Sequence, residues 1–279
     1  MTQRKILYGV WNGVKYDNTQ GGDEAPEGLN LSALTNFNPG NPIDAFVGAQ
    51  GFLVFDAKVP LAGILLRYYR RTRESSCGRC TPCRVASILM ETALQDTING
   101  YGRMVDWDHI LESAEQMKET SLCGIGLTTP AAMIGAIRFF LRRLMADPRD
   151  ISGDIYTTVT AKCIEACPSH VNIPRYINYV RDGHSDLAMG VLLQHYPLVA
   201  TCGRVCVRPC EAACRRRRVD TPVAIRDVKR YVSDNAGASV AELFENIRPV
   251  TDETKARVAV VGAGPAGLNC AYHLLMKGY

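Results

Sequence analysis

The sequence has no long hydrophobic run, no cysteine in its first 76 residues and no large excess of charge of either sign. Its longest apolar segments, near residues 61–66 and 131–137, are much shorter than the roughly 20 residues of a transmembrane helix, so we expect no membrane span. Residues 6–14 carry glycine, asparagine and tryptophan and lead to no small-residue cleavage site, so we expect no secretory signal peptide. The net charge of +4 is mild and argues against a dedicated nucleic-acid surface.

What the sequence does contain is eleven cysteines in 279 residues. The rest of the composition, with 47% hydrophobic and 22% charged residues, is ordinary for two or three globular domains and excludes wholesale disorder. Without a signal peptide we expect a cytoplasmic protein. In a reducing cytoplasm, clustered cysteines are usually metal ligands rather than disulfides. Ten of them lie between residues 77 and 214, and the eleventh is Cys270.

Hydrophobic periodicity divides the chain into four segments and predicts a mainly α fold. Residues 1–60 are expected to be irregular or β, with one clear strand-like run over 51–56. Residues 61–148 are expected to form a four-helix domain, because apolar residues recur at steps of three and four. Residues 149–250 are expected to form a second domain of short helices, and residues 255–279 a strand, a loop and a helix. The four long helices are predicted over residues 61–73, 83–94, 106–118 and 130–146.

The first cysteine group is the C-x2-C-x2-C run ESSCGRCTPCR over residues 74–84. A cubane iron–sulfur cluster needs thiolates that converge from several directions, and two-residue spacers let one tight loop supply three. Gly78 permits unusual backbone angles, and Pro82 stiffens the turn. A fourth cysteine follows in a glycine-flanked loop between two predicted helices. We therefore predict a [4Fe-4S] cluster, with zinc or unligated core cysteines as the alternatives; its ligands would be Cys77, Cys80, Cys83 and Cys123.

These residues resemble a known family. The segments GFLVFD (51–56), ESSCGRCTPCR (74–84) and SLCG (121–124) are similar to the C-terminal part of the NADH-oxidising flavoprotein subunit of respiratory complex I and its hydrogenase and formate dehydrogenase relatives. The resemblance covers about residues 45–146 and implies a four-helix bundle with one [4Fe-4S] cluster that takes electrons from FMN. Residues 1–50 lack the glycine-rich loops of the FMN- and NADH-binding domain of that family, so we do not expect NADH oxidation at FMN here.

A second cysteine group begins with CIEACP over residues 163–168 and continues with four cysteines at four-residue steps between residues 202 and 214. On one continuous helix these four would spread along the axis, too far apart for a single cluster. Gly203 and Pro209 are expected to break that helix. We therefore predict a folded-back loop that, together with Cys167, wraps a cluster.

The second group also resembles a known domain. The patterns C-x3-C-P from residue 163, IPRYI (173–177) and CGRVC-x3-C-E-x2-C from residue 202 are similar to the N-terminal iron–sulfur domain of the glutamate synthase small subunit and dihydropyrimidine dehydrogenase. The resemblance implies a helical domain with two [4Fe-4S] clusters. It would assign Cys163 and Cys214 to one cluster, and Cys167, Cys206 and Cys210 to the other.

This chain departs from that second pattern in two places. The family has a further C-x2-C upstream of Cys163, whereas residues 151–162 contain no cysteine. Some members use a non-cysteine ligand near the position of Lys229, and a protonated lysine has no lone pair for a metal. We therefore predict one complete cluster in this half, with Cys163 and Cys214 left over or in an incomplete site, and about eight irons per chain. The predicted ligands are Cys167, Cys202, Cys206 and Cys210.

Four consecutive arginines, 215–218, follow the last of these cysteines. A run of this kind is either a solvated basic turn or a patch that steers an acidic partner or phosphates to the protein.

The last segment contains a glycine-rich loop, VAVVGAGPAGLNCA over residues 258–271. A β-branched strand before G-x-G-x-x-G and a helix after it are the context of a dinucleotide-binding loop. Gly262 would make the tight turn, Gly264 would let the backbone approach a pyrophosphate, and Gly267 would let the helix pack closely. The loop, including Pro265 and Ala266, resembles the FAD-binding loop of the same glutamate synthase-like flavoproteins. We expect only the first strand and helix of an FAD domain within residues 255–279.

The two resemblances, in this order, imply the flavin-linked subunit of soluble NADPH-dependent iron–sulfur oxidoreductases. They imply NAD(P)H oxidation at FAD in the complete protein and relay of single electrons through [4Fe-4S] clusters to a partner subunit or acceptor. No Ser-His-Asp or Cys-His arrangement is present, and we predict no catalytic side chain. The alternatives are a zinc-stapled structural module and a redox-sensing interaction module with no turnover of its own.

Overall fold

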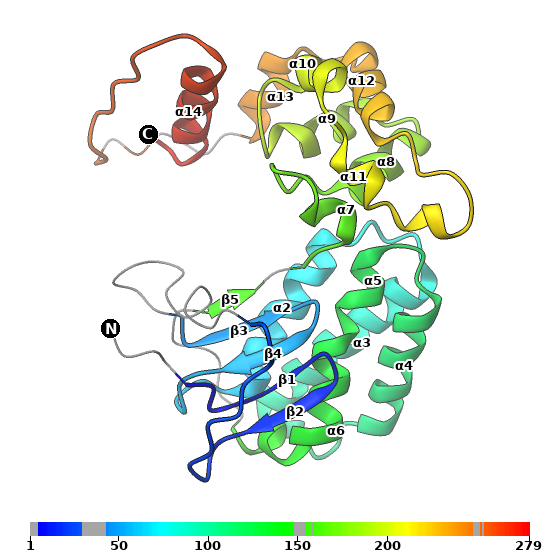
Figure 1. Cartoon of the computed structure of the whole chain (residues 1–279), viewed down its shortest axis with the longest axis vertical. Coiled ribbons are helices and arrows are strands. Elements are labelled where there is room, and N and C mark those ends of the chain that lie inside the picture. The colour runs from blue at the N-terminus through cyan, green and yellow to red at the C-terminus, as the bar shows by residue number, and fades with distance from the viewer. Residues whose placement is uncertain (1–4, 30–42, 148–154, 158, 248–251, 253) are drawn as a thin grey trace. The chain divides into compact units, whose positions relative to one another are not determined.

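The computed structural model describes residues 5–29, 43–147, 155–157, 159–247, 252 and 254–279. It is 56% helix, which confirms the mainly α fold class (Figure 1). The chain divides into two compact units, Met1–Ala161 and Lys162–Tyr279, and each is described by itself.

The first unit contains a small sheet with strand order β2-β1-β4-β3-β5. The pairs among the first four strands are antiparallel, and β5 pairs with β3 in parallel. Between β1 and β2, Asn12 and Gly13 have φ angles of 51° and 81°, as a two-residue hairpin turn requires. The strands are β1 Tyr8–Trp11, β2 Val14–Asp17, β3 Ala45–Gly48, β4 Gly51–Val54 and β5 Ile155–Thr157.

The sheet fits the expectation of irregular or β structure over residues 1–60 and corrects that for residues 155–157. The run over 51–56 is present as β4, and the segment 1–60 contains three further strands. The Asn-Gly pair between β1 and β2 is the sequence signal for a hairpin. Residues 155–157, which we expected in the second helical domain, form β5 instead, because the free edge of β3 offers unpaired backbone groups. Parts of the expected segments lie outside the described residues: 1–4, 30–42, 148–154, 158 and 248–250.

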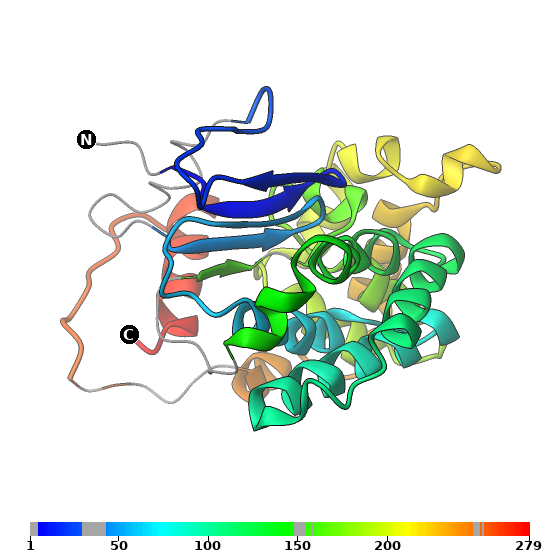
Figure 2. The same ribbon diagram turned by 90° about the horizontal axis from the view of Figure 1, so that it is seen from below.

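Helices α2 and α6 cover one face of the sheet (Figure 2). Helix α2 also packs on α3, α3 on α4, and α4 on α6. All four helices end within two residues of their predicted bounds. Buried Tyr8, Phe52, Tyr68 and Tyr69 lie in the shared core. The elements of this layer are α2 Leu61–Ser75, α3 Thr81–Asp96, the π-helix η1 Thr97–Tyr101, α4 Trp107–Thr120, α5 Gly124–Thr128 and α6 Pro130–Ala146.

Among the described residues, one helical stretch, Gly124–Ala146, is long and apolar enough by length and composition to cross a membrane. Its most apolar window is 61% buried inside the protein. Several residues of α6, including Met133 and Leu144, belong to the core of the first unit. This burial is typical of a core helix.

The second unit is built from short helices. Helix α8 packs on α9, α10 on α12, and α11 on α7. Tyr176 of α8 is buried and donates a 2.9 Å hydrogen bond to the carbonyl of Ile225 at the start of α12. The helices are α7 Lys162–Glu165, α8 Ile173–Arg181, α9 Ser185–Leu193, α10 Val199–Val205, α11 Pro209–Ala212, the 3-10 helix η2 Arg215–Arg218, α12 Ile225–Asn235, α13 Val240–Ile247 and α14 Pro265–Met276.

The expected strand before the glycine-rich loop is not formed. Residues 255–263 contain no regular element, and Val258, Val260 and Val261 are 38–98% exposed. A strand needs a neighbour for its backbone hydrogen bonds, and none of the described strands pairs with this segment. The expected helix is present as α14, so only the second half of the predicted strand–helix unit is formed.

Candidate iron–sulfur centres

The four cysteines of the first group line one small cavity in the first unit. Cys80 is the N-cap of α3, Cys83 lies in the first turn of that helix, and Cys123 is the N-cap of α5. Helix N-termini present unpaired backbone N–H groups and a partial positive charge, which favour thiolate sulfur. The fold therefore gathers three sulfurs from one loop and a fourth from a distant one. The cavity is lined by Ser76, Cys77, Cys80, Cys83, Ser121, Cys123, Ile125 and Gly126.

Backbone donors point at two of these sulfurs. The N–H groups of Ile125 and Gly126 donate to the sulfur of Cys123. The N–H of Leu122 donates to the sulfur of Cys80 at 3.4 Å. Donors of this kind stabilise the anionic form of a metal-bound thiolate.

The loop between Cys77 and Cys83 is held in shape by its own side chains. Gly78 has a φ of +73°, which glycine adopts without strain, and its carbonyl accepts a 2.7 Å hydrogen bond from the guanidinium of Arg84. The hydroxyl of Ser76 lies 3.4 Å from the sulfur of Cys83. Gly78 therefore has the unusual backbone angle that the sequence predicts. The hydrogen bonds around it hold the turn that carries Cys77, Cys80 and Cys83.

Burial makes these thiols poor acids on their own. It raises the pKa of Cys83, and it raises the pKa of Cys123 to about 11. A thiol with a raised pKa is protonated at neutral pH unless a nearby cation stabilises its thiolate. Metal coordination supplies that cation and releases the proton, so this donor set fits a metal centre.

A zinc ion and a cubane need different spacings of these four sulfurs. Four sulfurs on one zinc ion would lie about 3.8 Å apart, given zinc–sulfur distances of about 2.3 Å. Each thiolate of a cubane binds a different iron, so its sulfurs are spread more widely. The C-x2-C-x2-C run with a distant fourth cysteine is the pattern that favours the cubane.

Four cysteines of the second group share one neighbour in the second unit. The pKa of Tyr196 is raised by burial and then by all four thiols. Burial also raises the pKa of Cys202, and it raises the pKa of Cys210 to about 11. Two other thiols of the set, Cys167 and Cys206, raise the pKa of each of these thiols further. The four thiols that act on Tyr196 are the ones that the sequence predicts as ligands: Cys167, Cys202, Cys206 and Cys210.

The expected folded-back loop is present, but its breaks differ from prediction. Helix α10 ends at Val205, Arg208 has a left-handed backbone (φ 52°), and α11 begins at Pro209. Gly203 does not break the helix. It lies inside α10, where a Cβ would approach the backbone of Arg230 to 2.9 Å, so its role is close packing of α10 on α12.

Cys163 and Cys214 have neighbours of their own. Cys163, in α7, acts on Tyr176 together with Cys167 and Cys210. Cys214 is the N-cap of η2 and acts electrostatically on Arg216. Their exclusion from the second cluster stays a prediction from the sequence.

Two segments of the chain match family models. Residues 63–147 match the family described as the NADH-ubiquinone oxidoreductase-F iron-sulfur binding region. Residues 156–240 match dihydropyrimidine dehydrogenase domain II, 4Fe-4S cluster. Each matched segment is thus similar to an iron–sulfur domain of a known family. The two matched segments, called below the first and second iron–sulfur domains, confirm both resemblances drawn from the sequence.

Two relatives align with almost the whole chain, across both iron–sulfur domains. The chain is 30% identical to the NADP(+)-dependent formate dehydrogenase subunit beta of Moorella thermoacetica and to the NADPH-Fe(3+) oxidoreductase subunit beta of Geobacter sulfurreducens, in each case over 99% of its length. It covers 46% and 41% of those two proteins. It is also 32% identical, over 43% of its length and 28% of the relative's, to the NAD-dependent dihydropyrimidine dehydrogenase subunit PreT of Escherichia coli.

The second iron–sulfur domain contains a buried cation that the sequence alone did not place. Lys229 of α12 is 9% exposed, and its ammonium lies 5.9 Å from the ring centre of Tyr196. It also acts on the thiol of Cys202. Among the described residues no carboxylate forms an ion pair with it. A buried charge is stable only with compensation, and an anionic cluster on the four thiolates would supply it.

The arginine run forms the exposed helix η2. Arg216 makes a two-pronged ion pair with Asp220, with both distances 2.7 Å. Arg217 donates to the carbonyl of Ala212 at 3.0 Å. The structure therefore shows local pairing for part of this exposed run, which lies within the second iron–sulfur domain.

The glycine-rich loop has the backbone that its sequence requires. Gly262 has a φ of +107°, and a Cβ at Gly267 would overlap the carbonyl oxygen of Gly262. Pro265 occupies the first turn of α14, where its missing N–H costs nothing. Only glycine fits at residues 262 and 267, as the dinucleotide-loop interpretation expects. Cys270 in α14 is exposed.

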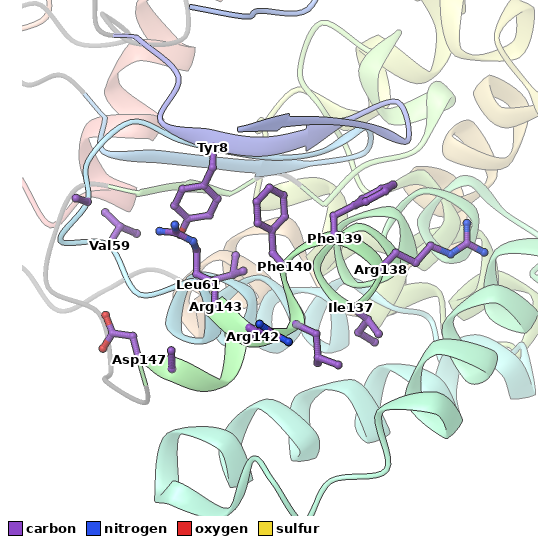
Figure 3. Close-up of a pocket in the computed structure, with 13 residues that line it drawn as sticks. Tyr8, Val59, Leu61, Ile137, Arg138, Phe139, Phe140, Arg142, Arg143 and Asp147 are labelled. Carbon is purple, nitrogen blue, oxygen red and sulfur yellow. The ribbon is translucent and has the colours of Figure 1, made fainter. Parts of the chain in front are cut away.

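A larger cavity of about 680 Å³ lies between the sheet and α6 (Figure 3). Helix α6 is distorted at Phe140 (φ −134°). The guanidinium of Arg143 lies 4.3 Å from the ring centre of Tyr8, and the ammonium of Lys15 lies 5.4 Å from that of Phe140. None of the predicted site residues lines this cavity, so it has no part in the iron–sulfur sites.

The close approach at Gly126 gives a testable consequence for the first iron–sulfur domain. A Cβ at Gly126 would overlap the Ser121 side chain and lie 3.4 Å from the Cβ of Cys83. We expect Gly126→Ala to destabilise the unit by about 1–3 kcal/mol, the usual cost of overpacking, and to lower the iron content. Gly190→Ala is the matched control, because a Cβ at Gly190 in α9 meets nothing within 4 Å. Thermal unfolding of the two purified variants measures the difference, and equal melting temperatures would contradict the assigned crowding.

Proposed function

We propose that this chain is the electron-transfer part of an NAD(P)H-linked flavin and iron–sulfur oxidoreductase subunit of the cytoplasm. The observation that carries the proposal is the match of two segments to [4Fe-4S] families, the first of which lines one cavity with four cysteines. The chain spans less than half the length of its two full-length relatives. NAD(P)H, FAD and a catalytic or iron–sulfur partner subunit are therefore proposed for the complete protein.

The proposed ligands follow the two sets. The four-helix segment 61–148, which contains the first iron–sulfur domain, would hold one [4Fe-4S] cluster, and the segment 149–250, which contains the second, would hold another. Bound clusters of this type accept and release single electrons. The protein binds them, shields them from water and sets their potential with nearby donors and charges. The first cluster would use Cys77, Cys80, Cys83 and Cys123, and the second Cys167, Cys202, Cys206 and Cys210.

The flavin proposal is carried by the loop before α14. Its N-terminal N–H groups and close glycine packing suit the pyrophosphate of a dinucleotide, and the proposed contacts are Gly262, Gly264, Pro265, Ala266 and Gly267. Residues 255–279 would then be the start of the FAD-binding domain of the complete protein. Full-length protein with Gly267→Val should lose bound FAD while keeping its iron, whereas retention of both would contradict the assignment.

The electron-transfer proposal is tested by spectroscopy of the anaerobically purified chain. We expect brown protein with broad absorption near about 400 nm that bleaches when dithionite supplies electrons. A colourless protein with stoichiometric zinc would instead support a structural module. Clusters whose redox state changes the affinity for a partner without any electron transfer would support a sensor.

The exposed arginines predict a salt-dependent rate. With Arg217→Glu and Arg218→Glu together, we expect the reduced chain to transfer electrons to ferricyanide, an anionic acceptor, about threefold to tenfold more slowly at low salt. The difference should vanish at high salt, where the Debye length is about 3 Å. Arg103→Glu with Lys118→Glu, in the other unit, makes the same change of net charge and is the control. Equal rates for the two double variants at low salt would contradict a steering role and support the interpretation of residues 215–218 as a solvated basic turn.

A further inference from the structure

We propose that Lys229 is a positioning residue that raises the reduction potential of the second cluster by placing an unpaired positive charge beside it. The inference rests on the proposed function, because it requires a cluster on the four thiolates of the second iron–sulfur domain. In this proposal Lys229 acts on the cluster through its charge and is not a ligand to iron, since a protonated lysine has no lone pair to donate.

The position of Lys229 in α12 is unusual for a lysine. Ile225 and Val232, four residues before it and three after it, are buried in the core of the second unit. Lys229 therefore lies on the apolar face of the helix, and the residue is 9% exposed. Arg226 and Arg230 on the same helix have the ordinary arrangement, with partly or fully exposed guanidinium groups paired to Asp227 and Asp234.

The groups around Lys229 explain what keeps it there. Its ammonium faces the ring of Tyr196, and a ring face compensates only a small part of a buried charge. Helix α10, which carries Cys202, packs on α12, which carries Lys229. Lys229 acts on the thiol of Cys202, and the four thiols raise the pKa of Tyr196. Among the described residues Lys229 forms no ion pair with a carboxylate. The negative charge that completes this site would come from the four thiolates and their cluster.

The charge has a direct effect on electron affinity. When the cluster takes up one electron, its total negative charge grows by one, and no bond is formed or broken. A fixed cation in a medium of low dielectric constant stabilises the reduced form more than the oxidised form. Lys229 therefore favours reduction, and the equilibrium between the two forms depends on its charge. The polarity of the residue alone would not have this effect.

The experiment compares Lys229→Met with the unaltered chain in redox titrations followed by electron paramagnetic resonance. We expect the equilibrium constant for reduction of the second cluster to fall about tenfold to a hundredfold, a shift of roughly −60 to −120 mV at about 59 mV per tenfold change for one electron. Lys229→Arg should restore most of the potential. The first cluster serves as an internal reference, and its potential should not move in either variant.

Two further variants control for charge and folding. Arg230→Gln removes a positive charge from the exposed face of the same helix and should leave the second cluster unchanged. Lys229→Gln keeps a polar head group without charge, in case the methionine variant loses its cluster. Loss of the second cluster from both neutral variants, but not from Lys229→Arg, would equally show that the site requires the cation.

The inference is overturned if a neutral variant keeps the second cluster with an unchanged potential, or if Lys229→Arg behaves like the neutral variants. Iron analysis of the unaltered chain separates this outcome from failure of the proposed function. About four irons per chain, all in the first iron–sulfur domain, would remove the second cluster and with it the premise.

Discussion

Replacing Cys123 with alanine is expected to abolish the [4Fe-4S] signal of the first iron–sulfur domain and to lower the iron content from about eight towards about four per chain. Cys123 is the proposed ligand that comes from a distant loop, and its sulfur receives two backbone hydrogen bonds. Without it, one iron of the cubane has no protein thiolate, and the three remaining cysteines cannot enclose the cluster.

The same substitution is expected to lower the melting temperature of the first unit by roughly 10 °C. Metal binding and folding share one free energy, and a loss of several kcal/mol shifts the melting temperature of a unit of this size by about 2–4 °C per kcal/mol. Cys270→Ala is the matched control, because Cys270 is exposed and lies in α14. Retention of the full iron content and an unchanged signal in Cys123→Ala would refute the assignment of this ligand.

The second large effect distinguishes the cysteines of the second iron–sulfur domain from one another. We expect Cys210→Ala to lose the second cluster, because its buried thiol interacts with Cys167 and Cys206. Cys214→Ala should keep it, because Cys214 lies at the start of η2 and acts on Arg216 instead. Iron analysis and low-temperature spectra of the two variants measure the difference.

The outcome also decides between the structure-based set and the pairing implied by the family resemblance. That pairing assigns Cys163 and Cys214 to a cluster of their own, and in that case Cys214→Ala would lose a signal. Equal loss of iron in both variants would therefore contradict the single complete cluster proposed for this domain.

The first cluster site was predictable because its information is local. Three ligands lie within one short motif, and the fourth is the one other cysteine before residue 163. The helices that hold them have strong apolar periodicity, and Asp106 caps α4 by accepting a hydrogen bond from the N–H of His109 at 3.0 Å, as its place before an apolar run predicts. The contact at Gly126 was not predictable, because it depends on how closely α5 approaches Cys83.

The surroundings of the second site were less predictable, because they depend on which residues distant in the sequence pack together in the fold. A lysine at position 229, between apolar residues at 225, 228 and 232, was a readable signal for a buried cation in α12. Its neighbour Tyr196 lies far away in the sequence and offered no such signal. Gly203 was misleading, since the loss of helix propensity at one glycine is small compared with the packing that its missing side chain allows.

The β elements show the limit of periodicity in short segments. Strands of three or four residues, such as β2 and β5, are too short for an alternating pattern and are specified by their neighbours in the sheet. The same dependence explains the opposite error at residues 256–261, where a clear β-branched pattern has no partner among the described strands and forms no strand.

The central claim is that this chain holds two [4Fe-4S] clusters on two sets of four cysteines, and metal analysis tests it most directly. Chain purified without oxygen should contain about eight irons and eight acid-labile sulfides, no stoichiometric zinc, and two distinguishable reduced-cluster signals. Zinc in place of iron would contradict the account outright. About twelve irons per chain would show that Cys163 and Cys214 hold a third cluster.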